Sequence, residues 1–157
     1  LRKRTNAHVL IVGGDGLGYG HCAPNSLSWR EYLMAEVGGE LDLRRVHFLG
    51  KVPYQTYLDL LSVSKVHSYW TTPFVLSWSF LEAVFSGLPV IASNTQPVTE
   101  FAKNLGVETF DFFDIDAFTG NAVKLLQTKT NLRRKVNFPE LYLENSLKQQ
   151  VKLINDI

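Results

Sequence analysis

The sequence predicts a Rossmann-like α/β fold in which a parallel β-sheet carries helices on both faces. Short apolar runs rich in Val, Ile and Phe alternate along the chain with segments whose apolar residues recur at helical spacing. The apolar runs are not interrupted at every second position by polar residues, which is typical of parallel strands buried between helices. We find no internal repeat, low-complexity segment or internal linker. We therefore expect one domain, with an N-terminal tail over residues 1–7 and a C-terminal helix over residues 139–157.

The first strand and helix are marked by a glycine-rich turn and a capping box. Residues 8–12 (HVLIV) form the first apolar run, which we expect to be a buried strand, and residues 13–20 (GGDGLGYG) form the turn after it. Ser28 and Glu31 have the S-x-x-E spacing in which each side chain caps the backbone of the other at a helix start. A helix is therefore expected from Ser28 to about Val37, where two glycines end it.

The middle of the chain supplies two further strand–helix units. Residues 46–49 and 66–70 are short apolar runs with the composition of strands. The helix after each run is predicted from a stripe of apolar residues. These stripes are Tyr54, Tyr57, Leu58 and Leu61 in the first helix, and Leu81, Val84, Phe85 and Leu88 in the second, which begins near Ser77.

The last third of the chain continues the same alternation of strands and helices. Its apolar runs and helical spacings predict strands at residues 90–92 and 107–110, and helices at residues 98–103, 117–126 and 141–154.

The overall composition argues against several classes of protein. Lys and Arg (16) nearly balance Asp and Glu (15), which gives no reason to expect a nucleic-acid partner. Cys22 is the one cysteine, so no internal disulfide is possible and a reducing, cytoplasmic location is expected. We expect neither a transmembrane segment nor a signal peptide, because no apolar run approaches roughly 18 residues. The basic cluster at residues 2–4 is interpreted as a solvated tail, with peripheral attraction to an anionic membrane as the alternative.

Function is expected at the carboxyl ends of the strands, because open parallel sheets bind ligands in the loops that follow those ends. The glycine turn at residues 13–20 matches no G-x-G-x-x-G window, and no acidic residue ends the next strand to bind a ribose. Its glycines therefore permit either close approach of a ligand or a wide turn. The loop at residues 50–53 either binds a nucleotide base through its exposed backbone groups or is a plain turn between strand and helix.

The loop and helix start at residues 71–82 give the strongest indication of a ligand site. The free amides at the start of this helix, and the helix dipole, favour an anion such as a diphosphate. Glu82 shares a polar stripe with Ser79 and Ser86 among apolar neighbours. A carboxylate in that position can accept two hydrogen bonds from the neighbouring hydroxyls of a ribose.

Three strings in this part of the chain match the pattern of a known family. They are VHFLGKVP, YWTTPF and SFLEAVFSGLPVIASNTQPVTE, the last of which ends at Glu100. Through them the chain resembles the retaining glycosyltransferases of family 4, which have the two-domain GT-B architecture, and it resembles their C-terminal, donor-binding domain. The resemblance implies transfer of a sugar from a UDP-, GDP- or ADP-sugar with retained anomeric configuration, in glycan biosynthesis. It implies no cofactor and no metal ion, because amides and basic side chains would meet the leaving-group charge.

The resemblance also assigns donor-binding residues by position. Glu82 corresponds to the second glutamate of the family's E-x7-E motif, which binds the donor's ribose, and Phe74 stands in place of the first. No catalytic residue is assigned in this chain. The implied donor-binding residues are Gly13 and Gly14 facing the cleft, Gly50, Lys51 and Val52 at the base, Leu76, Ser77 and Trp78 at the diphosphate, Glu82 at the ribose, Asn94, Thr95 and Gln96 near the sugar or phosphates, and Phe74 at the position of the first motif glutamate, with no role assigned to it.

A second departure from the family pattern lies at the start of the chain. The family's C-terminal domain opens with a strand and helix that supply an Arg and a Lys for the diphosphate, and this unit would precede Leu1. The N-terminal domain that binds the acceptor would precede it as well. We therefore expect a fragment that is inactive alone and whose partner is the missing N-terminal acceptor domain of the same protein. The absent strand lies in mid-sheet in the family, and we expect the remaining strands to keep their family positions as far as they can.

Three other functions stay open at this point. An NAD-dependent oxidoreductase is disfavoured by the failed glycine fingerprint, and a sugar-nucleotide epimerase needs catalytic carboxylates and histidines that the sequence does not place. A nucleotide-binding or scaffold module would have no chemistry of its own. The other notable side chains are interpreted structurally: His8, His47 and His67 as packing or edge residues, Trp29, Trp70 and Trp78 as core or cleft wall, and Asp114 as a helix cap.

Overall fold

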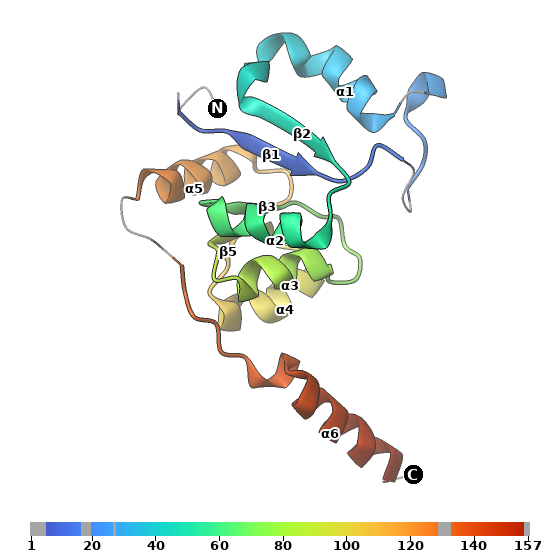
Figure 1. The fold of residues 1–157 in the computed structure, drawn as a ribbon, viewed down its shortest axis with the longest axis vertical. Helices are drawn as coiled ribbons and strands as arrows, with labels where there is room; N and C mark the ends of the chain where they lie inside the picture. The colour runs from blue at the N-terminus through green and yellow to red at the C-terminus, as the bar shows by residue number, and fades with distance from the viewer. Residues whose placement is uncertain (1–5, 17–19, 27, 129–132, 156–157) are drawn as a thin grey trace. The chain divides into compact units, whose positions relative to one another are not determined.

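The computed structural model describes residues 6–16, 20–26, 28–128 and 133–155, which form two compact units (Figure 1). Unit 1 is Leu1–Leu60 and unit 2 is Leu61–Ile157. The basic cluster at residues 2–4, and the part of the glycine turn at residues 17–19, lie outside the described residues. No helix in the described part of the chain is long and apolar enough to cross a membrane.

Unit 1 is built on two parallel strands. Strand β1, Val9–Val12, pairs with β2, Val46–Gly50, so that Val9 lies opposite Val46. The connection contains helix α1, Trp29–Val37, and three short 3-10 turns. The turns are η1 (Pro24–Ser26), η2 (Gly38–Glu40) and η3 (Leu43–Arg45).

The predicted capping box starts α1. The Ser28 N–H donates to Glu31 Oε2 at 2.9 Å, and the Glu31 N–H donates to Ser28 Oγ at 3.2 Å. These two bonds satisfy backbone donors that a helix start otherwise leaves without partners. The helix ends as expected at Gly38, whose N–H donates to the carbonyl of Met34. Both predictions are confirmed.

The prediction of a buried first strand is wrong. The side chains of β1 are 37–41% exposed along the whole strand, although all four are apolar. A parallel strand is buried when strands flank both of its edges and helices cover both faces. In the described part of unit 1, β1 has β2 on one edge, and no residue of α1 is buried.

Unit 2 holds the core of the molecule. Three parallel strands lie in the order β3–β4–β5, with bounds His67–Tyr69, Val90–Ser93 and Glu108–Phe110. All four residues of the central strand β4 are buried. Helix α3 (Trp78–Phe85) contacts β4, α4 (Gln96–Leu105) contacts β5, and α5 (Ile115–Gln127) contacts both. Phe80 and Val98, from α3 and α4, are fully buried with Ile91 of β4.

Parallel strands and helices alternate as predicted, so the α/β class is confirmed. The five described strands form two hydrogen-bonded sheets where one sheet was expected. No ladder joins β1 to β3 in the described residues, which leaves each of them with a strand neighbour on a single edge. Helix α2, Tyr54–Val63, lies in sequence between the two sheets.

The chain after α5 is fastened to unit 2 by two arginines. The Arg133 guanidinium donates to the carbonyls of Leu61 (2.7 Å), Ser64 (3.2 Å) and Ser86 (3.2 Å). The Arg134 N–H donates to the Gly87 carbonyl at 2.9 Å. Because α2 and α3 end near these carbonyls, the Arg133 charge lies where the helix dipoles are negative.

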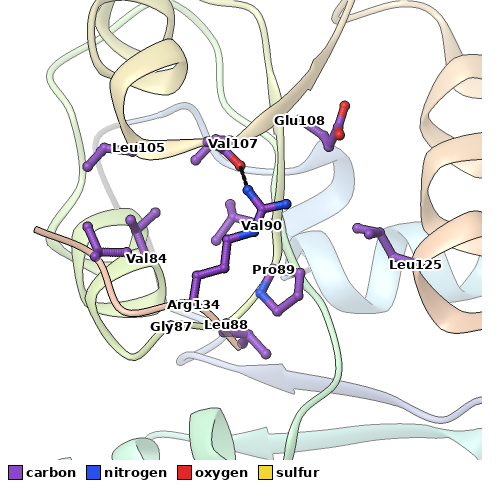
Figure 2. A pocket seen from close by; sticks show the side chains of 12 residues that line it. Val84, Gly87, Leu88, Pro89, Val90, Leu105, Val107, Glu108, Leu125 and Arg134 are labelled. Atoms are coloured by element: carbon purple, nitrogen blue, oxygen red, sulfur yellow. Dashed lines mark hydrogen bonds between the residues drawn. The ribbon is translucent and has the colours of Figure 1, made fainter. Parts of the chain in front are cut away.

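Arg134 also borders a small cavity of about 40 Å³ at the amino ends of β4 and β5. Figure 2 shows its side chain among Val90, Pro89 and Glu108. One guanidinium nitrogen donates to the Gly106 carbonyl at 3.3 Å. This cavity lies at the opposite edge of the sheet from the loops in which a ligand was expected.

The C-terminal segment is helical over much of the expected range. A 3-10 turn, η4 (Pro139–Leu141), precedes α6 (Leu143–Asn155), and residues 156–157 lie outside the described residues. No residue of α6 is buried, and its apolar stripe of Leu143, Leu147, Val151 and Ile154 is 49–73% exposed.

Candidate functional site

The carboxyl edge of the β3–β4–β5 sheet brings together the loops that follow β3 and β4. Ser93, the last residue of β4, is completely buried. Its Oγ accepts a hydrogen bond from the Thr71 N–H (3.0 Å) and donates one to the Thr71 carbonyl (2.9 Å). The loop after β3 is therefore held against the end of β4, at the edge where parallel sheets bind ligands.

Ser77 caps the helix that follows this loop. Its Oγ accepts from the Ser79 N–H at 3.2 Å, while its own N–H donates to the Tyr69 hydroxyl at 3.3 Å. Of the three amides predicted to hold a diphosphate, that of Ser77 is therefore already engaged. The amides of Leu76 and Trp78 have no acceptor among the described residues. They remain as the donors that a helix N-terminus presents to an anion.

Glu82 lies in the second turn of α3 and is half-buried. Ser79, one turn before it, is half-buried too, and its Oγ lies 2.8 Å from Ser77 Oγ. Ser86, the third residue of the predicted polar stripe, is exposed, and its hydroxyl donates to the Ala83 carbonyl at 2.7 Å. The polar stripe therefore runs from the capped start of α3 to Glu82. Ser86 lies at the other end of the same helix, where it is the C-cap.

Two aromatic side chains of the predicted site are exposed. Trp78 is 80% exposed, so it does not belong to the core, and Phe74, in the position of the first motif glutamate, is 59% exposed. Trp70 behaves differently. Its ring packs edge-on against Phe110 at 4.8 Å, and its Nε1 donates to the Phe112 carbonyl at 3.1 Å. Trp70 thereby fastens the loop after β3 to the loop after β5.

The turn after β4 carries the last three predicted site residues. The Asn94 N–H donates to the Phe110 carbonyl at 2.8 Å, which fixes the turn to β5. The side chains of Asn94 and Gln96 are exposed, whereas Thr95 is buried at the N-cap of α4. All three lie in unit 2, with Phe74, Leu76, Ser77, Trp78 and Glu82.

The other predicted residues lie in unit 1, where the loops after β1 and β2 touch. The Gly13 N–H donates to the Gly50 carbonyl at 2.9 Å, and both glycines have positive φ (+147° and +65°). A Cβ added to Gly14 would lie 2.8 Å from Cε of Lys51, so this glycine makes room for that side chain. Lys51 is exposed and Val52 is half-buried.

Several contacts around these loops had no clear signal in the sequence. Arg30 of α1 pairs with Asp15 of the glycine turn at 3.2 Å and lies over the Phe48 ring at 4.2 Å. His8 Nδ1 and His47 Nε2 are 2.9 Å apart, a hydrogen bond between the residue that leads into β1 and a residue of β2. These partners are distant in sequence, and the parallel pairing of β1 with β2 brings His8 and His47 together.

Asp42 and His67 are among the titratable groups outside the predicted site whose pKa values are shifted. The guanidinium groups of Arg44 and Arg45 hold the pKa of Asp42 well below its usual range. Burial lowers the pKa of His67, because the charged imidazolium is disfavoured away from water. Asp114 is the helix cap that the sequence predicted, and its Oδ1 accepts from the Ala117 N–H at 2.8 Å.

A capped helix start, two amides with no acceptor among the described residues, and the half-buried Glu82 carboxylate thus lie near the carboxyl edge of the unit 2 sheet, the edge at which open α/β sheets bind ligands. The family model described as glycosyl transferases group 1 matches residues 1–128, and the chain belongs to this family. A comparison with curated proteins gives no match.

Two solved structures show the same fold. The structure of Anabaena Alr3699/HepE in complex with UDP has a TM-score of 0.71 at 13% identity, over 98% of this chain and 42% of that one. AviGT4, a glycosyltransferase involved in avilamycin A biosynthesis, has a TM-score of 0.57 at 16% identity, over 93% of this chain and 42% of that one. The chain therefore spans less than half the length of either structure.

Proposed function

We propose that the chain is the donor-binding part of a retaining glycosyltransferase of family 4, and that it binds a nucleoside-diphosphate sugar. The observation that carries the proposal is the arrangement on α3, in a chain that belongs to the glycosyl transferases group 1. The amide of Trp78 precedes the half-buried carboxylate of Glu82 by about one turn, and the amide of Leu76 lies two residues further back. Such spacing suits a nucleoside diphosphate, whose phosphates and ribose are neighbours.

Each group has a distinct part in the proposed chemistry. The helix N-terminus and its amides stabilise the negative charge that grows on the departing diphosphate as the sugar is transferred. Glu82 accepts hydrogen bonds from the two ribose hydroxyls and so fixes the nucleotide along α3. Acceptor binding and turnover belong to the remainder of a larger protein, since the solved structures are more than twice as long as the matched part.

UDP is the first nucleotide to test, because the HepE structure is a complex with UDP. GDP and ADP serve as the competing bases. We expect isothermal titration to show binding of one of the three nucleotides. Replacing Glu82 by Ala should weaken this binding at least about tenfold, since two hydrogen bonds to a charged group are lost. Glu144→Ala, an exposed glutamate in the first turn of α6, is the matched control and should bind like the parent chain.

The proposal fails if the folded chain binds all three nucleotides equally and Glu82→Ala changes none of the affinities. That result would favour a module that binds phosphate and does not distinguish one nucleoside from another.

A further inference from the structure

Two histidine rings meet across the strands of unit 1. His8 Nδ1 lies 2.9 Å from His47 Nε2, and the rings are nearly parallel, at 14°, with their centroids 5.2 Å apart. His8 is exposed and His47 is half-buried, so solvent can reach the pair. Both residues lie at the amino ends of their strands, since His8 immediately precedes β1 and His47 is the second residue of β2.

The register of β1 on β2 explains why the two rings share one face of the strand pair. Leu10 lies opposite His47, and His8 is two residues before Leu10, so all three side chains point to the same side. Phe48 follows His47 and points to the other side, where Arg30 of α1 lies over its ring at 4.2 Å. The histidine pair therefore lies on the face of β1 and β2 that is opposite to Arg30.

The separation of the two nitrogens suits a transition-metal ion. Imidazole nitrogens bind such ions at about 2.0–2.1 Å, so two of them at a right angle on one ion lie roughly 2.9 Å apart. In the hydrogen bond between the rings, one proton lies between these nitrogens. Each neutral imidazole can carry its proton on its other nitrogen instead, so a change of tautomer makes both lone pairs available to a cation. The exposed His8 ring can turn until the two lone pairs converge.

We propose that His8 and His47 chelate one divalent transition-metal ion of the kind that prefers imidazole, and that the ion clamps β1 to β2. Cu²⁺, Ni²⁺ and Zn²⁺ belong to this kind. A right angle between ligands is typical of Cu²⁺ and Ni²⁺, whereas Zn²⁺ favours a tetrahedral angle. The described part of the chain has no group of three or more His, Cys, Asp or Glu side chains that could hold an ion, so water completes the coordination.

The clamp acts in a unit that has little core. Among the described residues of unit 1, Ala23 is the only buried apolar side chain. Metal binding commonly supplies part of the folding energy where a small unit buries little apolar surface. The two histidines are 39 positions apart, so the folded strand pair binds an ion more tightly than the unfolded chain and is stabilised by it. Nucleotide binding at α3 uses other residues, so either property can hold without the other.

The test is an isothermal titration of the whole untagged chain with CuCl₂ and with NiCl₂. MgCl₂ should give no binding, because Mg²⁺ prefers oxygen ligands. His8→Gln keeps a polar side chain at an exposed position and should lower the Cu²⁺ affinity about tenfold or more, because one imidazole then holds the ion alone. His21→Gln, at another exposed histidine of unit 1, is the matched control and should bind Cu²⁺ like the parent.

Two further readouts report on the chelate itself. The electron paramagnetic resonance spectrum of bound Cu²⁺ should show two coordinating imidazole nitrogens in the parent chain and one in His8→Gln. NiCl₂ should raise the melting temperature of the parent and of His21→Gln, and should leave that of His8→Gln unchanged.

Three results would overturn the inference. Equal Cu²⁺ affinities of the parent and His8→Gln would show that the pair does not bind the ion. An affinity that is lost in His21→Gln instead would assign the ion to His21 and the neighbouring exposed thiol of Cys22. A spectrum of the parent with fewer than two coordinating nitrogens would show that the two rings do not chelate one ion.

Discussion

Ser93 and Thr71 form a closed pair of hydrogen bonds at the carboxyl edge of the unit 2 sheet. The Ser93 hydroxyl accepts a hydrogen bond from the Thr71 N–H at 3.0 Å and donates one to the Thr71 carbonyl at 2.9 Å. Ser93 itself is completely buried. The pair holds the loop after β3, which leads to the diphosphate-binding amides that we propose. The position of that loop thus depends on one side chain of the neighbouring strand.

Replacing Ser93 by Ala should therefore destabilise unit 2 by about 2 kcal/mol, since two backbone groups of Thr71 lose their partner. Denaturant unfolding of the two chains would measure the difference. Ser86→Ala is the control, because this serine is exposed and its hydroxyl bonds a helix-end carbonyl at its own surface. Its effect should be within about 0.5 kcal/mol. Equal effects of the two substitutions would argue against a special role for the Ser93 pair.

A substitution at Gly87 would test how closely the segment that contains Arg134 packs against unit 2. Its φ is +78°, and a Cβ at this position would lie 2.5 Å from the Arg134 carbonyl oxygen. Gly87→Ala should cost about 2 kcal/mol or more, because both the backbone conformation and the contact become strained. Gly120 of α5 is the opposite case, because a Cβ added there would meet nothing within 4 Å. Gly120→Ala should stabilise the helix by up to about 1 kcal/mol. Thermal unfolding would show shifts of opposite sign.

Arg133 is expected to stabilise unit 2 more than its neighbour Lys135. It donates to the carbonyls of Leu61, Ser64 and Ser86, whereas Lys135 is exposed. Arg133→Ala should destabilise unit 2 by about 2 kcal/mol, since several carbonyls lose a charged donor. Arg133→Lys should recover only part of this, because one ammonium cannot reproduce the planar set of guanidinium donors. Full recovery by lysine, in the same unfolding measurement, would show that charge alone is responsible.

His67 should make unit 2 less stable in mild acid. Burial lowers its pKa in the folded state, so below the ordinary value of about 6.5 the unfolded chain takes up a proton that the folded chain resists. Stability should fall as the pH drops from about 6.5 towards the lowered pKa of the folded state. His67→Gln should reduce this dependence, as measured by unfolding between pH 7 and pH 5. The same pH dependence in His67→Gln and the parent would contradict this assignment.

The sequence predicted the features that depend on neighbours along the chain. The capping box of Ser28 and Glu31, the glycine that ends α1, the helix start near Ser77 and the cap Asp114 all lie where expected. Each is set by contacts within a few residues, and such contacts have recognisable spacings.

The features that the sequence did not predict depend on partners far along the chain. The exposure of β1 follows from which strands flank it, and an apolar run alone cannot show this. Trp78 has the residue type of a core position and is 80% exposed. The Ser93–Thr71 pair joins residues 22 positions apart, and the His8–His47 pair joins residues 39 positions apart.

The most direct test of the central claim is an amide NMR titration of the chain with UDP and, separately, with uridine. If the start of α3 holds the diphosphate, UDP should shift the signals of Leu76 and Trp78, and uridine should leave them in place. Signals that do not respond to UDP, or that respond equally to uridine, would contradict diphosphate binding at this helix.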